Sequence, residues 1–592
     1  MCEKTVNTKT NNTIKHLLNP LKYATSNKLQ KEKVSALVHE FGEELRNISG
    51  KCMDIGCGPG DITKDIILPA LDPKATIIGT DISKYMIYYA KKMYDAKERI
   101  KYEVLDIQTK NLPTKYVSEF DFIFSFHALH WCNDIEQAFE NIYRMLRPDG
   151  TMLVLFVSSH NIFKVLENVM QDIRFAPYIT DINKYIWPFQ NSIHPHKELR
   201  KLLQKLGFTI KHCSLRETYY FDELKDRFFS SIVSFLDFIN DMPCNRQEEF
   251  KKEFKNKFSK ARIIFQRNDK EVVLDVYESL IAFAEKHELF ILTIFSAFLK
   301  TILILFLMEK TINIGTIKYS SNPLLYTTSN KLQREKVSVL IEEFGEELRN
   351  ISGKCMDIGC GPGDITKDII LPALDPKAMI IGTDISKHMI YYAEKMYGAK
   401  GRLKFEVLDI QTKNLPTKYV SEFDFIFSSH TLHWCNDIEQ AFKNIYRMLR
   451  PNGTMLILFV SSHKIFDVLK NVTQDIRFAS HVIDMNISPF QNSIHPRKEL
   501  QKLLQKIGFT IKHCSFRDSY DLEKNTDQFF NSIVSFLDFI DDIPCDQKEE
   551  FKKEFKDRYL ETQFICQQEN NKKKVILNAY NVLVTFAQKR IL

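Results

Sequence analysis

The chain has 592 residues, more than one hydrophobic core usually supports, so we expect more than one domain. Its 44% hydrophobic and 27% charged content is typical of globular protein and excludes a disordered or fibrous chain. The 82 basic and 75 acidic side chains leave a net charge of +7, a mild imbalance that argues against nucleic acid as the main partner.

The N-terminus is polar and shows no apolar signal core. The twelve cysteines form no C-x-x-C motif and no Cys/His zinc pattern. We therefore expect reduced thiols, a cytoplasmic location and no bound metal.

A long internal repeat decides the domain organisation. Met53–Asp61 returns as Met356–Asp364, an offset of 303 residues. The offset has become 301 by Pro188 and Pro489, so the second copy lacks two residues before that point. A period near 300 residues predicts a tandem pair of domains and not a solenoid.

The segment between the copies carries an apolar run. We predict a polar tail at 1–18, a first domain at 19–286, a linker at 287–318 and a second domain at 319–592. The run at 289–308, interrupted by Lys300, is long enough to span a bilayer. A single span would put two copies with the same cofactor loop on opposite sides of a membrane. We therefore favour a connecting helix or a segment without selected structure, and keep a membrane span as the alternative.

Strand-like and helix-like patterns alternate within each copy. This alternation predicts an α/β fold with a mostly parallel sheet and helices on both faces. Strands of the first copy are expected at 52–55, 76–80, 101–105, 120–124, 151–157, 208–212 and 276–284. Helices are expected at 31–46, 61–67, 84–93, 135–146 and 197–206.

The pattern changes after the sixth strand. Asp222–Arg262 is typical of two helices broken at Met242-Pro243-Cys244, and this piece lies between two strands. It should form a helical cap beside the sheet. Its phenylalanines are explained by ordinary core packing, or alternatively by an apolar substrate pocket.

The first strand ends in a glycine loop, with Gly56, Gly58 and Gly60 at alternate positions. Glycine allows positive φ and a close approach of backbone to ligand, and this end of the sheet is where open α/β folds bind ligands. The dinucleotide fingerprint has its third glycine one position later. Asp54, beside the loop, suits a cofactor that carries an amine and no phosphate.

Acidic residues follow the next two strands. Asp81 closes the second strand, where a carboxylate can accept from both hydroxyls of a ribose. Asp106 can accept from the exocyclic amine of adenine while Ile107 packs on the ring. This set fits S-adenosylmethionine better than NAD. The second copy repeats it with Asp357, Gly359, Gly361, Gly363, Asp384, Asp409 and Ile410.

These are the motifs of class I methyltransferases, and the sequence resembles the insect juvenile hormone acid methyltransferase family along nearly all of each copy. The resemblance is carried by the glycine loop and by Tyr23-x-x-Ser26-Asn27-x-Leu29-Gln30, Leu68-Pro69, Gly79-Thr80-Asp81-Ile82-Ser83-x-x-Met86 and Phe124-Ser125-Phe126-His127-Ala128-Leu129-His130-Trp131. It implies two tandem Rossmann-like domains, each with a seven-stranded sheet and a helical cap inserted before the last strand.

The resemblance also implies a site. Gln30 and Trp131 would contact the substrate carboxylate and the cofactor, as would Gln333 and Trp434 in the second copy. Further cofactor contacts would come from Ile82, Ser125, Ile385 and Ser428. Histidines near the end of the fourth strand are candidates for substrate contact: His127, His130, His430 and His433. Trp131 could instead be interior packing, and Gln30 could be a helix residue facing water.

The chemistry agrees with these residue types. A carboxylate is ionised near pH 7, so its methylation is an in-line displacement that needs alignment and no general base. Gln30 and Trp131 can each donate a hydrogen bond to a carboxylate oxygen. We expect a carboxyl O-methyltransferase acting on a small apolar acid of isoprenoid or fatty type, similar to juvenile hormone acid or farnesoic acid.

Other functions stay open at this point. The acceptor could be another organic acid, or an amine or alcohol, for which a histidine would have to act as a base. The chain could also be a non-catalytic ligand-binding relative. We expect no obligate protein partner.

The copies differ near the presumed site. The aligned pairs are Phe126 and Ser429, Ala128 and Thr431, and Tyr85 and His388, while Trp187 falls at the two-residue deletion. Because the cofactor residues are the same, we expect both copies to bind cofactor and to prefer different acceptors.

Overall fold

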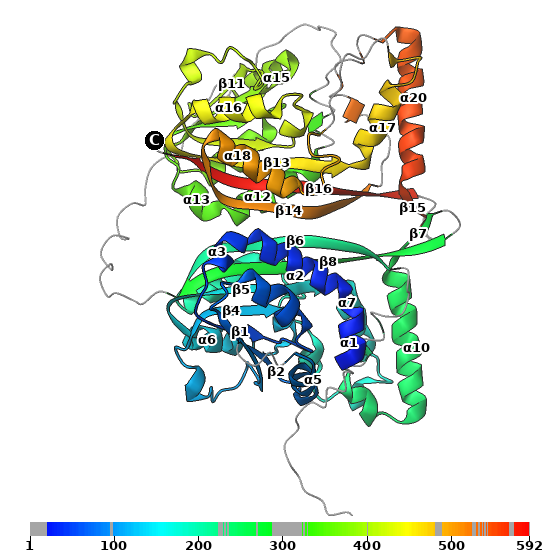
Figure 1. Cartoon of the computed structure of the whole chain (residues 1–592). Coiled ribbons are helices and arrows are strands. Elements are labelled where there is room, and N and C mark those ends of the chain that lie inside the picture. Colours follow the sequence, from blue (N-terminus) through cyan, green and yellow to red (C-terminus); the bar gives the residue numbers. More distant parts are fainter. Residues whose placement is uncertain are drawn as a thin grey trace, which may run out of the picture. The chain divides into compact units, whose positions relative to one another are not determined.

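A computed structural model describes most of the chain. The described residues are 20–94, 99–222, 229, 232–233, 236–267, 270–286, 323, 326–327, 330–398, 401–479, 488–523, 529–530, 533–534, 537, 540, 543–567 and 574–590. They fall into two compact units, the first within 1–264 and 271–288 and the second within 265–270 and 289–592 (Figure 1).

The first unit is built on a seven-stranded sheet with the order β3-β2-β1-β4-β5-β8-β6. Its neighbours from β3 to β5 are parallel, whereas β8 runs antiparallel to both β5 and β6. The strands are β1 (Lys51–Ile55), β2 (Thr76–Asp81), β3 (Ile100–Val104), β4 (Phe120–Phe126), β5 (Leu146–His160), β6 (Phe208–Asp222) and β8 (Lys270–Lys286), and the short β7 (Ile263–Arg267) precedes β8. The predicted mostly parallel sheet is confirmed.

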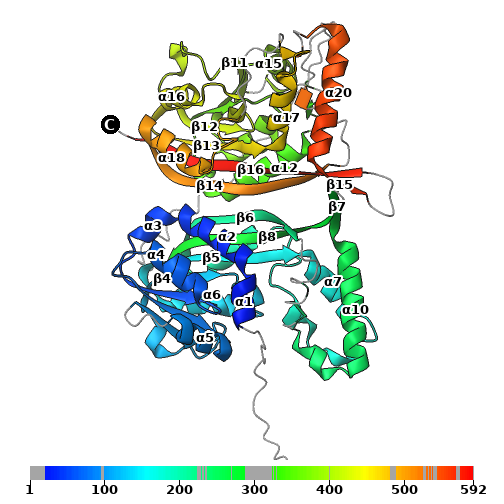
Figure 2. The same ribbon diagram turned by 45° about the vertical axis from the view of Figure 1, so that its right-hand side comes forward.

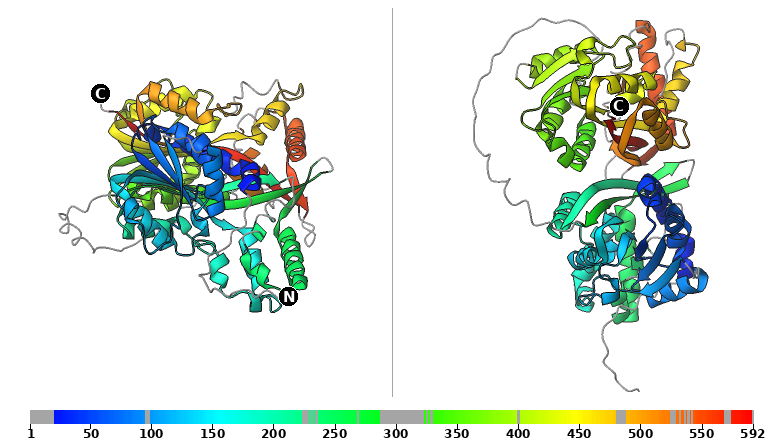
Figure 3. Two further views of the ribbon diagram at one scale, coloured as in Figure 1. Left: turned by 60° about the horizontal axis from the view of Figure 1, so that its bottom comes forward. Right: turned by 60° about the vertical axis from the view of Figure 1, so that its left-hand side comes forward.

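Helices cover both faces of this sheet, because each side of a buried parallel sheet is apolar (Figure 3). One core forms under α2, α3, η1 and α5, and the other forms under α6 and α8. The helices are α1 (Pro20–Ser26), α2 (Lys28–Glu40), α3 (Gly42–Arg46), η1 (Thr63–Ile67), α4 (Leu68–Ala70), α5 (Lys84–Tyr94), η2 (Thr114–Tyr116), η3 (Leu129–Trp131), α6 (Ile135–Met145) and α8 (Pro195–Lys205).

A separate helical cap contains α7 (Asn161–Met170) and α10 (Cys244–Ala261), which lie side by side in Figure 2 and pack on each other. The short turns η4 (Ala176–Tyr178), η5 (Ile182–Tyr185) and η6 (Asp237–Asp241) complete it. Three cap phenylalanines on α10 are buried in a shared core: Phe250, Phe254 and Phe258. The expected second helix is α10, whereas much of the first lies outside the described residues. The cap also recruits α7, which the sequence pattern did not indicate.

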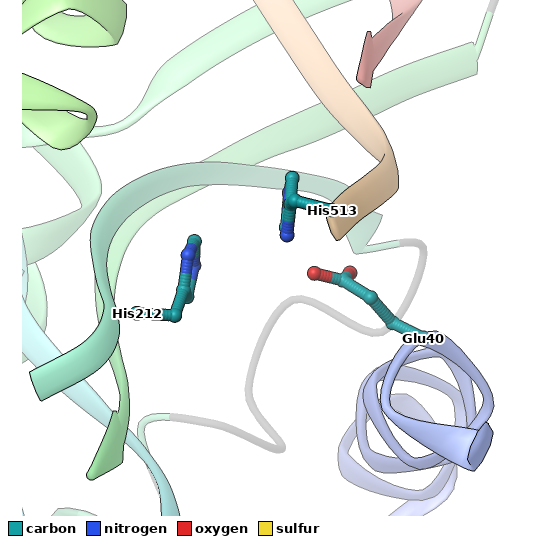
Figure 4. Close-up of side chains that lie close together, drawn as sticks. All are labelled: Glu40, His212 and His513. Atoms are coloured by element: carbon teal, nitrogen blue, oxygen red, sulfur yellow. The ribbon is translucent and has the colours of Figure 1, made fainter. Parts of the chain in front are cut away.

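Helix α2 is held at its C-terminal end by a buried ion pair. Arg216 on β6 donates to both carboxylate oxygens of Glu40, at 2.8 and 2.6 Å. His212 lies beside this pair, and its Nε2 is 2.8 Å from the Ser214 hydroxyl. Figure 4 shows Glu40 on the helix and His212 on the strand. The pair therefore fixes α2 against the last strand of the sheet.

The second unit repeats the architecture with the strand order β11-β10-β9-β12-β13-β16-β14. Its strands are β9 (Lys354–Ile358), β10 (Met379–Asp384), β11 (Leu403–Val407), β12 (Phe423–Ser429), β13 (Leu449–His463), β14 (Phe509–Glu523), β15 (Phe564–Gln567) and β16 (Lys574–Lys589). Its helices are α12 (Lys331–Glu343), α13 (Gly345–Arg349), η7 (Thr366–Ile370), α14 (Leu371–Ala373), α15 (Lys387–Tyr397), η8 (Thr417–Tyr419), η9 (Leu432–Trp434), α16 (Ile438–Met448), α17 (Lys464–Thr473), α18 (Pro496–Ile507) and α20 (Cys545–Thr562).

The predicted tail at 1–18 and the linker at 287–318, with its apolar run at 289–308, lie outside the described residues. Within the described part of the chain, no helix combines the length and the hydrophobicity that crossing a bilayer would require.

Candidate active site

The glycine loop sits at the carboxyl end of β1, as its sequence predicts. Gly56, Gly58 and Gly60 all have positive φ, at 74°, 54° and 87°. A Cβ on Gly56 would lie 2.1 Å from the Ala128 Cβ, so the loop packs directly against the segment after β4. Among the described residues, a Cβ on Gly58 would come within 4 Å of one atom, a ring carbon of Tyr23 at 3.8 Å. The loop is thus closed at Gly56 and leaves space over Gly58.

Asp81, at the end of β2, ties the loop to the sheet. Its Oδ2 accepts the Gly58 N–H at 3.0 Å, and its Oδ1 accepts the Ser83 N–H at 2.8 Å. Burial raises the pKa of this carboxyl. A carboxylate has about four acceptor positions, so each oxygen can take one further hydrogen bond from a ribose hydroxyl. The adjacent Ile82 is exposed, as expected for a residue that would cover a ligand.

Asp54 lies behind the loop, almost fully buried. The hydroxyl of Thr63 donates to its Oδ2 at 2.6 Å. Burial raises the pKa of Asp54 to about 7, and the charges of Asp81 and Asp61 push it in the same direction. A positive charge bound at the loop would favour the ionised form, so this site suits a cationic ligand.

The remaining cofactor candidates follow β3 or lie within β4. Asp106 is exposed, and its Oδ1 accepts the Gln108 N–H at 2.9 Å. Ile107 is buried and is held through its carbonyl by the side-chain amide of Asn141 at 2.7 Å. Ser125 is fully buried and donates to the Ile55 carbonyl at 3.0 Å, so its visible contact is with the sheet.

Two histidines and a tryptophan follow β4. His127 has a positive φ of 55°, and burial lowers its pKa to about 4. Burial also lowers the pKa of His130 well below its usual value, with the charge of His127 adding to the effect. Among the described residues, the buried His127 Nε2 and His130 Nδ1 meet no hydrogen-bond partner. Both rings are therefore neutral near pH 7.

Trp131 belongs to an aromatic cluster that reaches the cap. We define the aromatic cluster as His130, Trp131, Phe163 on α7 and Trp187. The Trp187 ring centroid lies 4.6 Å from that of His130, 5.6 Å from Trp131 and 3.7 Å from Phe163. Trp131 nevertheless keeps 38% of its surface exposed, so it is not purely interior packing.

Gln30 lies in the first turn of α2, half-buried. The residues around it bind the loop: Asn27 Nδ2 donates to Asp61 Oδ2 at 3.0 Å, and Lys31 Nζ is 2.7 Å from the same oxygen. The Asp61 carboxylate therefore holds α2 through Oδ2 and also accepts the Ile62 N–H through Oδ1 at 3.1 Å. The signal for this contact was Asn27, which stands inside the segment that contains Gln30.

Tyr23 is a second residue that the sequence reasoning left without a role. Its ring stands over Gly58, and burial, helped by the charges of Asp61 and Asp81, raises its pKa to about 12. The neutral phenol can therefore donate a hydrogen bond across the physiological range.

The loop of the second unit has the same geometry. The Gly361 N–H donates to Asp384 Oδ2 at 3.0 Å, and Thr366 donates to Asp357 Oδ2 at 2.6 Å. Burial raises the pKa of Asp357 to about 7. Gly359, Gly361 and Gly363 again have positive φ.

The other second-unit candidates also keep their places. Burial lowers the pKa of His430 to about 4 and that of His433 well below its usual value. Arg334 replaces Lys31 and binds Asp364 at 2.6 Å. In the described part of this unit, the buried Gln333 Oε1 has no hydrogen-bond partner. The remaining contacts match the first unit: Ile385 is exposed, Asp409 Oδ1 accepts the Gln411 N–H, the Ile410 carbonyl accepts from Asn444, and Ser428 donates to the Ile358 carbonyl.

The site fits S-adenosylmethionine in three respects. The backbone at Gly58 has room for a ligand beside the Tyr23 ring, Asp81 presents two carboxylate oxygens to a diol, and a positive charge nearby would favour ionised Asp54. The comparisons with known proteins support the same cofactor.

Residues 53–154 and 356–457 each match the family described as a methyltransferase domain. The chain is 31% identical over 277 residues to juvenile hormone acid O-methyltransferase of Bombyx mori, covering 45% of this chain and 98% of that protein. It is 29% identical over 271 residues to the Drosophila melanogaster protein of the same name, covering 45% and 91%. Malonyl-[acyl-carrier protein] O-methyltransferase of Legionella pneumophila is 30% identical over 131 residues, covering 22% and 44%. The chain therefore belongs to the juvenile hormone acid O-methyltransferase-like family of S-adenosylmethionine-dependent carboxyl O-methyltransferases, whose domain it carries twice in tandem.

Proposed function

We propose that each unit methylates the carboxylate of a small, largely apolar acid of isoprenoid or fatty type. The observation that carries this proposal is the state of the histidines. With a pKa of about 4, His127 is too weak a base to remove a proton from an alcohol or an ammonium group near pH 7. A carboxylate arrives ionised and needs no base.

The proposed roles follow from position. When bound, the cofactor supplies an electrophilic methyl group on a sulfonium. Gln30 and Trp131 would each donate to a carboxylate oxygen of the acceptor, which fixes its approach. The two histidines would offer neutral ring nitrogens beside it, and the aromatic cluster would exclude water. Gln333, Trp434, His430 and His433 would act in the same way in the second unit. Alignment supplies most of the rate in such a displacement.

The cofactor set is proposed on the same grounds. The glycine loop would face the methionine part, and Asp81 would accept from the ribose. Asp106 and Ile107 would hold the adenine, with Ile82 covering it and Ser125 supporting the loop from β4. The domain limits proposed for these activities are 19–286 and 319–592.

The juvenile hormone acid named in two relatives makes an isoprenoid acid the first substrate to test. The assay follows transfer of a labelled methyl group by the full chain to farnesoic acid, to a fatty acid of similar length, and to the corresponding alcohol and amine. We expect product with the acids only. Exclusive turnover of the alcohol or amine would refute the proposal. The matched control carries Asp81→Ala and Asp384→Ala, which should reduce labelling of all acceptors together.

A further inference from the structure

In the first unit, Trp187 lies at the centre of the aromatic cluster. It is 5% exposed, and its ring lies between Phe163 of the cap and the His130–Trp131 pair that follows β4. A buried indole is among the largest side chains that can close such a space. The first unit therefore ends its site, on the cap side, at this ring.

The backbone assigns the equivalent position in the second unit. In the first unit, the Gln190 amide oxygen accepts the His160 N–H at 3.0 Å, and the Gln190 N–H donates to the Trp187 carbonyl at 3.1 Å. Gln491 makes the same two contacts, with the His463 N–H at 2.9 Å and with the Ser488 carbonyl at 2.9 Å. Ser488 thus stands where Trp187 stands, a counterpart that the sequence alignment had placed in a deletion.

Ser488 does not replace the indole. Its hydroxyl is buried against β13, where it lies 3.0 Å from the Val460 carbonyl and 2.8 Å from the Ser461 carbonyl. Phe466 meets His433 and Trp434 directly, with ring centroids 5.7 and 5.5 Å apart. The serine side chain therefore points to the strand, and among the described residues of this unit no ring takes the place of the Trp187 indole.

A cavity of about 590 Å³ opens at this point of the second unit. Its wall includes Ser488 and Cys435, the residue that follows Trp434. It also carries polar side chains from α17 and the following loop: Asp467, Lys470, Gln491 and Asn492. The exchange of a tryptophan for a serine is thus accompanied by open volume beside the serine, and the described residues of its wall include Cys435 but neither His433 nor Trp434.

We propose that this position sets the size of the acceptor. Trp187 closes the first site and restricts it to slender acids, whereas Ser488 lets the second site take acids with added bulk. The inference rests on the proposed acid methylation and adds a specificity-determining residue to it. A single chain would then carry two activities of one chemistry with different substrate ranges.

Each unit can be tested within the full chain by silencing the other. Asp357→Ala with Asp384→Ala silences the second unit, and Asp54→Ala with Asp81→Ala silences the first; a cofactor titration checks that one site remains. The readout is the ratio of kcat/KM for a branched bulky acid to that for a slender acid of equal chain length. A single methylene in an apolar pocket changes such ratios about 10- to 200-fold, so we expect the second unit to exceed the first by at least about tenfold.

Exchanging the two residues between the units then tests whether this position causes the difference in the kcat/KM ratio. Trp187→Ser in the first unit should raise the ratio about tenfold, and Ser488→Trp in the second should lower it by a similar factor. Ser488→Ala stays small and should keep the ratio of its parent. Trp187→Phe, which keeps a ring in the core, gives an intermediate ratio and serves if Trp187→Ser does not fold. If both units methylate acids but the kcat/KM ratios do not change with these exchanges, the inference is overturned and the proposed function stands. If neither unit methylates an acid, the proposed function itself is overturned.

Discussion

Replacing Asp81 by asparagine should weaken cofactor binding in one unit and leave the other unit as an internal reference. The carboxylate accepts two backbone N–H groups, from Gly58 at 3.0 Å and Ser83 at 2.8 Å. An asparagine of the same shape keeps one acceptor and turns an NH₂ group toward the second N–H. The loop then loses a charge-assisted hydrogen bond, and the ribose loses an acceptor.

The magnitude follows from these contacts. A hydrogen bond to a charged group is worth about 1.5–3 kcal/mol, so the affinity of the first unit should fall about tenfold to a hundredfold. The second unit, whose Asp384 accepts the Gly361 N–H at the same 3.0 Å, should bind as before. Isothermal titration of the full chain with S-adenosylhomocysteine should therefore show two sites in the parent protein and one strong and one weak site in Asp81→Asn.

Two matched variants serve as controls for this experiment. Asp384→Asn should produce the mirror-image result. Asp72→Asn alters a surface carboxylate that accepts the Lys74 N–H, and should leave both sites intact. Two unchanged sites in Asp81→Asn, or the loss of both, would refute the reasoning that each loop holds its own cofactor through this carboxylate.

Three further outcomes are expected. Arg216→Met leaves the Glu40 carboxylate buried without its guanidinium, which should lower the free energy of unfolding of the first unit by about 3–5 kcal/mol in urea. Adding Glu40→Gln to the same chain should recover most of that loss. Equal stability of the single and double variants would contradict the buried-pair argument. Because the pKa of Asp54 is raised to about 7, the carboxyl is protonated below pH 7 and a cationic ligand must displace that proton. Cofactor affinity in the first unit should therefore rise with pH up to about 7 and level off above it. Asp54→Asn should remove this pH dependence of the affinity. His127→Gln should keep methylation of acids within about tenfold, since no base is needed; a loss as large as that of a missing general base would point to an alcohol or amine acceptor instead.

Much of the fold follows from short-range patterns. The expected strands at 52–55, 76–80 and 101–105 agree with β1, β2 and β3 to within one residue, because each is an apolar run bounded by turn residues. Helix α7 was missed. The predicted strand ended at 157 and no element was expected at 161–170, where neither a glycine nor a proline marks the boundary between β5 and the helix. The helix begins directly after His160, an extended N-cap residue whose ring nitrogen accepts the Ile162 N–H.

Some residues of the candidate site could likewise be predicted from the sequence, and others could not. The glycines and Asp81 could be predicted because their spacing is set by one strand–loop–helix unit. Trp187 could not, since it reaches the site from an irregular segment and its neighbours are contributed by the cap and by the end of β4. The positive φ of His127 and the π-helical turn at η1 also depend on packing that no local pattern specifies.

Helix α2 has a consequence for how the protein would lose activity. Asn27 and Lys31 grip Asp61 next to the cofactor loop, one turn from Gln30, and Glu40 anchors the far end of the same helix to β6. The residue proposed to contact the acceptor and the proposed cofactor loop are thus both held by one helix. Heat or denaturant that loosens this helix should abolish both binding events of the first unit at a single midpoint, so this unit should not pass through a state that binds one ligand and not the other.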